Sequence, residues 1–127
     1  MRQIKGTHLL IDGYVKNPDT LTPDNISDLF DLLVPALKMQ YLQRPIALRV
    51  PIDKTKLDTE EDEGGWSVIC QITTSHISLH SWPERRAFMM DIFSCCDFDT
   101  DIAKEIIFSK LGVEKFNCQI IDRTIGK

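Results

Sequence analysis

The sequence predicts an α+β fold, a two-layer sandwich in which one antiparallel sheet carries two helices on one face. Two segments have apolar residues at helical spacing, and both carry helix-start signals. The other apolar runs are short and bounded by turn residues, as strands are. Most connections in the middle of the chain are also short, which favours antiparallel over parallel neighbours.

The first helix is expected to begin at Thr22, whose hydroxyl can cap it, with Pro23 at the first helical position. Apolar residues follow at helical spacing over residues 26–41. Pro35 lies inside that run, so we expect it to kink or break the helix there.

The second helix is expected to be capped by Asp99 or Thr100 and to stop at Gly112. A strongly acidic segment, residues 53–65, reads as a solvated loop. The expected strands, besides one through the central motif described next, cover residues 8–15, 46–50, 66–73, 87–95 and 116–121.

A polar strand organises the middle of the chain. The apolar residues Ile77 and Leu79 alternate with the polar residues His76, Ser78 and His80. Because successive side chains of a strand point to opposite faces, one face of this strand is expected to be buried and the other polar. That polar face carries groups that transfer protons, where a solvated strand usually carries Lys or Glu.

An antiparallel return strand would bring Cys95 near Ser75 and His80, and such a convergence is a candidate catalytic site. The residues alone leave other interpretations open. Ser75 could be a turn serine, Cys95 a small core residue and His80 a histidine bonded within the sheet. A zinc site of His76 and His80 with Cys95 or His8 is a further alternative, but no recognised ligand spacing supports it, and we expect no metal.

Length, charge and cysteine content narrow the class of protein. We expect a single domain over residues 1–127, which is long enough to bury its own core. A net charge of −4 gives no electrostatic case for nucleic acid, and no apolar run approaches a membrane span or a signal peptide. The four cysteines contain no Cys-x-x-Cys pair, so we expect reduced thiols and a cytoplasmic protein.

Residues 75–84, Ser-His-Ile-Ser-Leu-His-Ser-Trp-Pro-Glu, and residues 91–95, Asp-Ile-Phe-Ser-Cys, resemble the small prokaryotic type of S-adenosylmethionine decarboxylase. Residues 6–9, Gly-Thr-His-Leu, are similar to the Gly-x-His-Leu near the N-terminus of that family. The resemblance implies an enzyme that cleaves its own chain and works with the pyruvoyl group that cleavage creates.

The resemblance also implies roles for five residues. Ser75 matches the serine that attacks the preceding carbonyl and becomes the pyruvoyl group. His80 matches the acid/base histidine of self-cleavage, a role that suits imidazole, and Ser67 matches a serine that assists processing. Cys95 matches the thiol that protonates the α-carbon after decarboxylation. Glu84 matches a carboxylate on the substrate side, which can accept bonds from ribose hydroxyls or an amine.

Several positions depart from the family pattern, among them the non-standard flanks Ser81 and Met89-Met90. Thr74 replaces the glutamate before the cleaved serine, although cleavage is still expected between Thr74 and Ser75. Cys96 stands where the family has glycine. The family stacks an aromatic residue on adenine, and no aromatic stands at the matching place in the acidic segment.

The leading interpretation is a self-processing, pyruvoyl-dependent S-adenosylmethionine decarboxylase that supplies the aminopropyl donor for spermidine synthesis. The resemblance implies a small-molecule substrate and a homodimer of processed chains. Two alternatives remain open: a related pyruvoyl decarboxylase of ornithine or arginine, and a non-cleaving homologue that serves as a binding or regulatory subunit.

Overall fold

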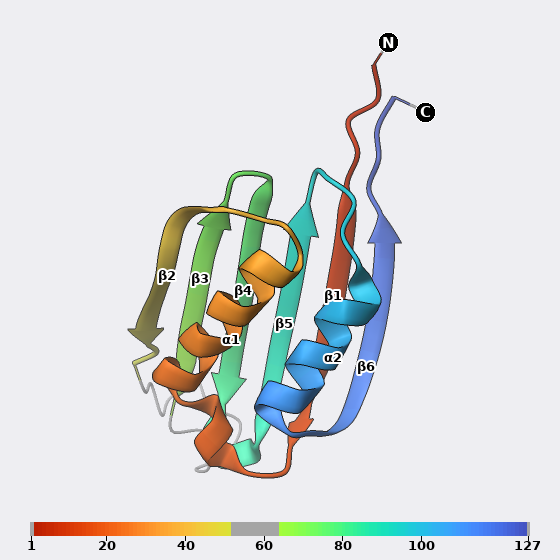
Figure 1. The fold of residues 1–127 in the computed structure, drawn as a ribbon. Helices are drawn as coiled ribbons and strands as arrows, with labels where there is room; N and C mark the ends of the chain where they lie inside the picture. Colours follow the sequence, from red (N-terminus) through yellow and green to blue (C-terminus); the bar gives the residue numbers. More distant parts are fainter. Residues whose placement is uncertain (1, 52–63, 127) are drawn as a thin grey trace.

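Among the residues that the structure describes, six strands form one sheet in the order β2-β3-β4-β5-β1-β6, with every neighbouring pair antiparallel (Figure 1). The computed structural model describes residues 2–51 and 64–126, so most of the predicted acidic loop lies outside the described residues. The strands are β1 (Thr7–Val15), β2 (Tyr41–Arg49), β3 (Trp66–Ile72), β4 (Ser75–Trp82), β5 (Ala87–Ser94) and β6 (Val113–Asp122). The helices are α1 (Pro23–Ala36) and α2 (Thr100–Leu111), with short 3-10 helices η1 (Pro18–Leu21) and η2 (Pro83–Arg85).

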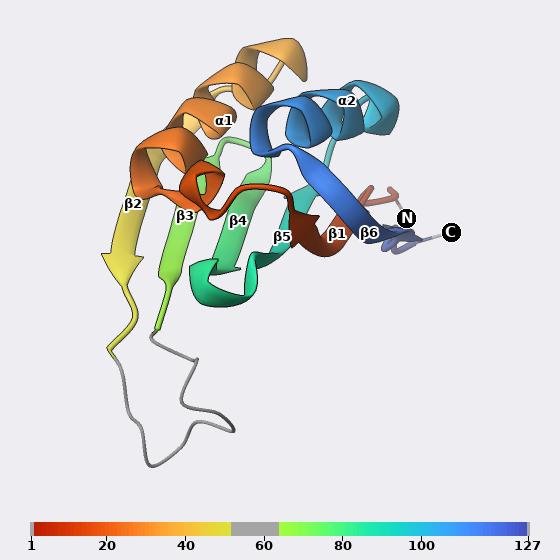
Figure 2. The same cartoon turned by 90° about the horizontal axis from the view of Figure 1, so that it is seen from below.

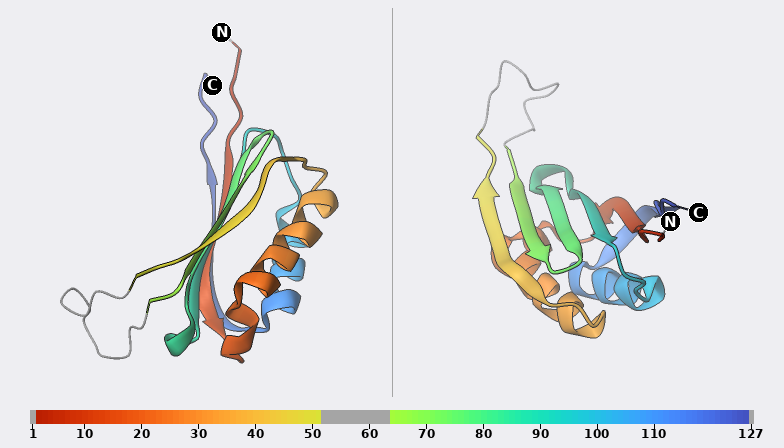
Figure 3. Two further views of the ribbon diagram at one scale, coloured as in Figure 1. Left: turned by 90° about the vertical axis from the view of Figure 1, so that its left-hand side faces the viewer. Right: turned by 90° about the horizontal axis from the view of Figure 1, so that it is seen from above.

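Both helices cover the same face of the sheet (Figures 2 and 3). The predicted α+β sandwich is therefore confirmed. We call the opposite side of the sheet, which neither α1 nor α2 covers, the open face. None of the described helices is long and apolar enough to cross a membrane.

Helix α1 begins as predicted and ends earlier than its apolar pattern. The hydroxyl of Thr22 accepts a hydrogen bond from the backbone N–H of Asn25, and proline occupies the first turn. The helix stops at Ala36, directly after Pro35, and Lys38 turns the chain away with a φ of 58°. Tyr41 therefore opens strand β2, and its inclusion in the helical run was wrong.

Helix α2 is closed at both ends by the expected residues. The carboxylate of Asp99 accepts hydrogen bonds from the backbone N–H groups of Asp101 and Ile102, at 3.0 and 3.1 Å. Gly112 ends the helix with a φ of 64°, a left-handed conformation that glycine adopts without steric cost. Both helices are thus fixed by local signals, and their apolar sides then face the sheet.

The two faces of the sheet differ as the alternation predicts. Ile77 and Leu79 of β4 and Ile92 of β5 are fully buried under the helices. Across the open face, strand pairing sets side chains in rows. Three of these rows are Ser67, His80, Met89, Asp12 and Asn117; then Ile69, Ser78, Asp91, Leu10 and Gln119; then Gln71, His76, Phe93, His8 and Ile121.

Two adjacent leucines of α1 test which side of the helix packs against the core. Leu33 is fully buried, whereas Leu32 is 49% exposed. We expect Leu33→Ala to lower the free energy of unfolding by about 2–5 kcal/mol, because it removes core contacts and leaves a cavity. We expect Leu32→Ala to change it by less than about 1 kcal/mol. Urea unfolding of both variants measures the difference, and equal losses would contradict the orientation of α1.

Candidate active site

The peptide bond between Thr74 and Ser75 lies in the tight turn that joins β3 to β4. Ser75 begins β4 with a φ of 151°, a region that residues with a side chain rarely adopt. The carbonyl oxygen of Thr74 accepts a hydrogen bond of 2.9 Å from the backbone N–H of Cys95. That donor draws electron density from the carbonyl carbon, which prepares it for attack by a nucleophile.

A second set of bonds holds the side chain of Thr74 at this turn. The hydroxyl of Ser94 donates to Oγ1 of Thr74 at 2.9 Å and accepts from the N–H of Cys96 at 3.1 Å. Ser94 is buried, with an exposed fraction of 1%. The threonine that replaces the expected glutamate therefore has its own partner at the end of β5, and Cys96 takes part through its backbone.

Cys95 lies where the sequence predicts, next to the Thr74–Ser75 bond. Its thiol is free and the residue is exposed, at the point where β5 ends. The pairing of Ser75 with Ser94 places residue 95 beside residue 74. The interpretation of Cys95 as a small core residue is excluded by its exposure.

His80 and Ser67 form a separate pair on the open face. Ring nitrogen Nδ1 of His80 lies 2.9 Å from Oγ of Ser67, which faces it across β3 and β4. His80 follows Ser75 by five residues of extended strand, which is a separation of roughly 17 Å. The expected convergence of Cys95 with His80 is therefore not found within one chain, because β4 is a single continuous strand.

Glu84 lies still farther from Ser75, in the 3-10 helix that follows β4. It is exposed and lines a cavity together with Arg49 and Trp66, at the opposite end of β4 from Ser75. Within one chain the five predicted site residues thus form two groups. Ser75 and Cys95 lie at one end of the sheet, and Ser67, His80 and Glu84 lie toward the other.

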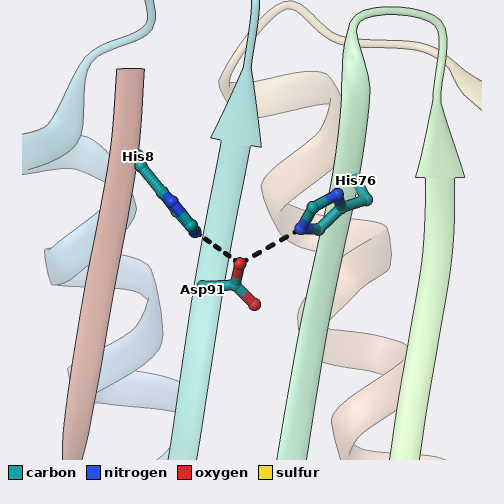
Figure 4. A group of neighbouring side chains, drawn as sticks. All are labelled: His8, His76 and Asp91. Atoms are coloured by element: carbon teal, nitrogen blue, oxygen red, sulfur yellow. Dashed lines mark hydrogen bonds and ion pairs between the residues drawn. The ribbon is translucent and has the colours of Figure 1, made fainter. Parts of the chain in front are cut away.

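Between these two groups, on the open face, the carboxylate of Asp91 accepts hydrogen bonds from three side chains, two of which are drawn in Figure 4. Oδ2 of Asp91 lies 2.6 Å from Nε2 of His8 and 3.1 Å from Nε2 of His76, and its other oxygen accepts from the hydroxyl of Ser78. Sequence reasoning gave His8 no role and did not single out Asp91. The signal available was the strand alternation, which puts Asp91 on the same face as the two histidines.

These donors keep Asp91 ionised. Burial by itself raises the pKa of the Asp91 carboxyl, but the hydrogen bonds from Ser78, His8 and His76 outweigh burial and lower the pKa below its ordinary value. The result is a fixed negative charge in the middle of the open face, stabilised by hydrogen bonds from its own neighbours.

His8, His76 and Asp91 also have ligand atoms within 4.8 Å of one another, close enough to share a metal ion. Nη1 of Arg123 lies 3.4 Å from Nδ1 of His8. A guanidinium only donates, so Nδ1 of His8 accepts and the ring proton sits on Nε2, where it is donated to Asp91. Nε2 of His76 likewise faces the ionised carboxylate, so hydrogen bonds hold the three side chains together. The alternative set of His76, His80 and Cys95 is not brought together.

A cavity of about 600 Å³ opens beside Ser75 on the open face. Its walls are apolar at Ile69 and Phe93 and polar at His76 and Ser78, and Arg123 closes one side. Its size is in the range of cavities that take small-molecule ligands. The nucleophile candidate therefore faces a space that a metabolite can enter.

Comparison with known proteins agrees with this geometry. The sequence profile of a family described as S-adenosylmethionine decarboxylase matches residues 7–124. The chain belongs to this family. A crystal structure of the adenosylmethionine decarboxylase from Aquifex aeolicus has the same fold, with a TM-score of 0.74, 21% identity, and coverage of 98% of this chain and 94% of that one.

Curated relatives carry two names. An S-adenosylmethionine decarboxylase proenzyme of Hydrogenobaculum is 27% identical over 129 residues, covering 98% of this chain and 86% of the relative. An arginine decarboxylase proenzyme of Aeropyrum pernix is 36% identical over 67 residues, and an S-adenosylmethionine decarboxylase proenzyme of Pyrobaculum neutrophilum is 38% identical over 64. Both matches span about half of each protein. The Aeropyrum match covers 52% of this chain and 51% of the relative, and the Pyrobaculum match covers 50% and 52%.

The lowered pKa of Asp91 predicts how stability depends on pH. A carboxyl with a lowered pKa in the folded state stabilises the protein above its unfolded pKa of about 3.9, and this contribution is lost as pH falls through the folded pKa. We expect Asp91→Asn to lower the free energy of unfolding at pH 6 by about 1–3 kcal/mol, and by less at pH 3.

Urea unfolding at the two pH values measures both effects. Asp28→Asn, on the exposed side of α1, controls for the change from carboxylate to amide. If Asp91→Asn lost as much stability at pH 3 as at pH 6, the assignment of an ionised, stabilising Asp91 would be wrong.

Proposed function

We propose that this protein is a self-processing, pyruvoyl-dependent decarboxylase of S-adenosylmethionine that supplies the aminopropyl donor for spermidine synthesis. The observation that carries the proposal is the Thr74–Ser75 bond, with a backbone donor on its carbonyl and a free thiol beside it. Support comes from membership of the family and from the relatives' names, which describe proenzymes.

The chain's own residues account for the cleavage step. Oγ of Ser75 bonds to the carbonyl carbon of Thr74 while the bond from that carbon to the nitrogen of Ser75 breaks, and the hydroxyl proton moves to the nitrogen. Negative charge that develops on the carbonyl oxygen is stabilised by the N–H of Cys95. Elimination from the resulting ester splits the chain, and with loss of ammonia and uptake of water residue 75 becomes a pyruvoyl group.

For decarboxylation the pyruvoyl group supplies an electron sink, the role that pyridoxal phosphate has in other enzymes. Residues around this group bind the substrate and transfer the proton. Phe93 and Ile69 give the cavity an apolar wall. Cys95, whose backbone N–H bonds the carbonyl of Thr74, has an exposed thiol that can return a proton to the α-carbon.

A second copy of the chain completes the site in this proposal. Ser75 and Cys95 lie at one end of the open face, and His80, Ser67 and Glu84 lie toward the other. A two-fold axis through the middle of that face brings the histidine of one protomer to the serine of its partner. The open face has apolar side chains to bury in such an interface, because Leu48, Ile69 and Met89 are 63%, 43% and 54% exposed.

A second substrate class has a specific observation in its favour. The relative from Aeropyrum pernix that matches half of this chain is named an arginine decarboxylase proenzyme. Release of labelled carbon dioxide from S-adenosylmethionine, arginine and ornithine, assayed in parallel, decides between them. We place the reaction in the cytoplasm, where the Cys95 thiol stays reduced. If the chain is never cleaved, the remaining interpretation is a non-cleaving homologue that serves as a binding or regulatory subunit.

Mass spectrometry of the purified protein tests the cleavage. We expect two fragments, divided between Thr74 and Ser75, with a pyruvoyl group at the start of the second. Ser75→Ala should remain whole, and Ser109→Ala, an exposed serine of α2, should cleave normally. A single intact mass after long incubation would falsify the enzyme proposal.

Cys95→Ala separates the two reactions. The backbone N–H of residue 95 survives this substitution, so the chain should still cleave. Decarboxylation should fall by about a hundredfold or more, which is the usual contribution of a positioned proton donor. Full turnover by the cleaved variant would show that the thiol is not the donor.

Mixed chains test the shared site. Ser75→Ala and His80→Ala should each cleave poorly or not at all when expressed alone. When they are expressed together with different tags, the His80→Ala chain should be cut, because its serine meets the intact histidine of the Ser75→Ala partner. Mass spectrometry measures the cleavage of each tagged chain. If the His80→Ala chain stays whole in the mixture, the site lies within one chain and the shared-site proposal is wrong.

A further inference from the structure

Arg123 follows the edge strand β6, and its side chain reaches the cavity beside Ser75 on the open face. Ser75, Ser94, Thr7 and Asp122 lie opposite one another across β4, β5, β1 and β6. Arg123 follows that row by one residue, and its backbone N–H donates to the carbonyl of Gly6 at 2.7 Å. Its side chain then extends back over β1, so the guanidinium stands above β5 and lines the same cavity as Ser75.

Two contacts hold the guanidinium in that place. Its central carbon lies 4.4 Å from the centre of the Phe93 ring, and Nη1 lies 3.4 Å from Nδ1 of His8. The Phe93 ring is itself packed between the rings of His8 and His76, with distances of 5.4 and 5.8 Å between ring centres. The guanidinium is therefore held from beneath and from one edge at the cavity, while Arg123 itself remains exposed.

The charge of Arg123 has no ion-pair partner in the part of the chain that the structure describes. Asp91, on the neighbouring row, already accepts from His8, His76 and Ser78. Of the side chains lining the cavity, Arg123 alone carries a permanent charge, and its five N–H donors exceed the one directed at His8.

We propose that Arg123 binds the α-carboxylate of the substrate in the cavity beside Ser75. This rests on the proposed function, because an amino acid that reacts through its amine at residue 75 brings its carboxylate into the same cavity. A guanidinium is the side chain best suited to hold a carboxylate with two parallel hydrogen bonds. S-adenosylmethionine, arginine and ornithine all carry this carboxylate. The test ligands are derived from S-adenosylmethionine, the substrate of the proposed function.

The ion pair has a distinctive kinetic consequence. It exists while the carboxylate is charged and disappears as neutral carbon dioxide forms, so it stabilises the bound substrate more than the transition state. Loss of Arg123 should therefore raise KM without lowering kcat. A residue that only supported the shape of the site would lower kcat as well.

Calorimetry with two ligands isolates the carboxylate. One ligand is a deaminated analogue of S-adenosylmethionine, which keeps the carboxylate but has no amine to react. The other is decarboxylated S-adenosylmethionine. For Arg123→Gln in the mature protein we expect Kd of the first to rise roughly ten- to hundredfold, and Kd of the second to change less than about threefold. Arg123→Lys should restore part of the lost affinity.

Arg44→Gln is the matched control. Arg44 also lies over an aromatic ring, 5.0 Å from the centre of Tyr41, but it pairs with Asp31 of α1, away from the open face. It should leave both Kd values unchanged. Equal weakening of both ligands by Arg123→Gln, no weakening of either, or failure of the unmodified protein to bind the deaminated analogue would overturn the assignment.

The kinetic arm keeps this proposal separate from the proposed function. If the protein cleaves and decarboxylates, Arg123→Gln should raise KM with kcat equal or higher, and a fall in kcat at unchanged KM would count against Arg123. If no amino acid is decarboxylated, the proposed function fails, and the calorimetric comparison of the two ligands still decides what Arg123 binds.

Discussion

The pairing of β4 with β5 is the constraint on which the rest of this site depends. Ser75 faces Ser94, so the carbonyl of residue 74 meets the N–H of residue 95. A shift of one residue would turn Ile77, Leu79 and their neighbours out of the core, because side chains alternate between faces. The apolar contacts under the two helices therefore fix the position of a polar bond at the end of the sheet.

The open face joins polar groups that are distant in the chain into one surface. Asp91 sits on the strand between those of His8 and His76, and its charge is balanced by hydrogen bonds rather than by solvent. Arg123 then adds a cation above the adjacent ring of Phe93. Charges of both signs are thus ordered over a few strands, without an ion pair between the arginine and the carboxylate.

Local patterns in the sequence predicted most of the fold. Thr22 and Asp99 cap helices, and the alternation around Ile77 gave the correct buried face. Tyr41 was misplaced because helical spacing continues past Pro35, where the backbone turns at Lys38. Residues 8, 91 and 123 escaped notice as a group, since only the pairing of β1 with both β5 and β6 brings them together, and that pairing is not a local property.

The place of Ser75 in a tight turn also determines what a broken bond leaves behind. Strands β3 and β4 are paired from Ser67–His80 to Ile72–Ser75, so a nick between residues 74 and 75 would cut the connection and leave the strand pairing in place. A molecule nicked there would be a pair of peptides, each supplying strands that the other needs. Its unfolding would be a dissociation, and its melting temperature would rise with protein concentration.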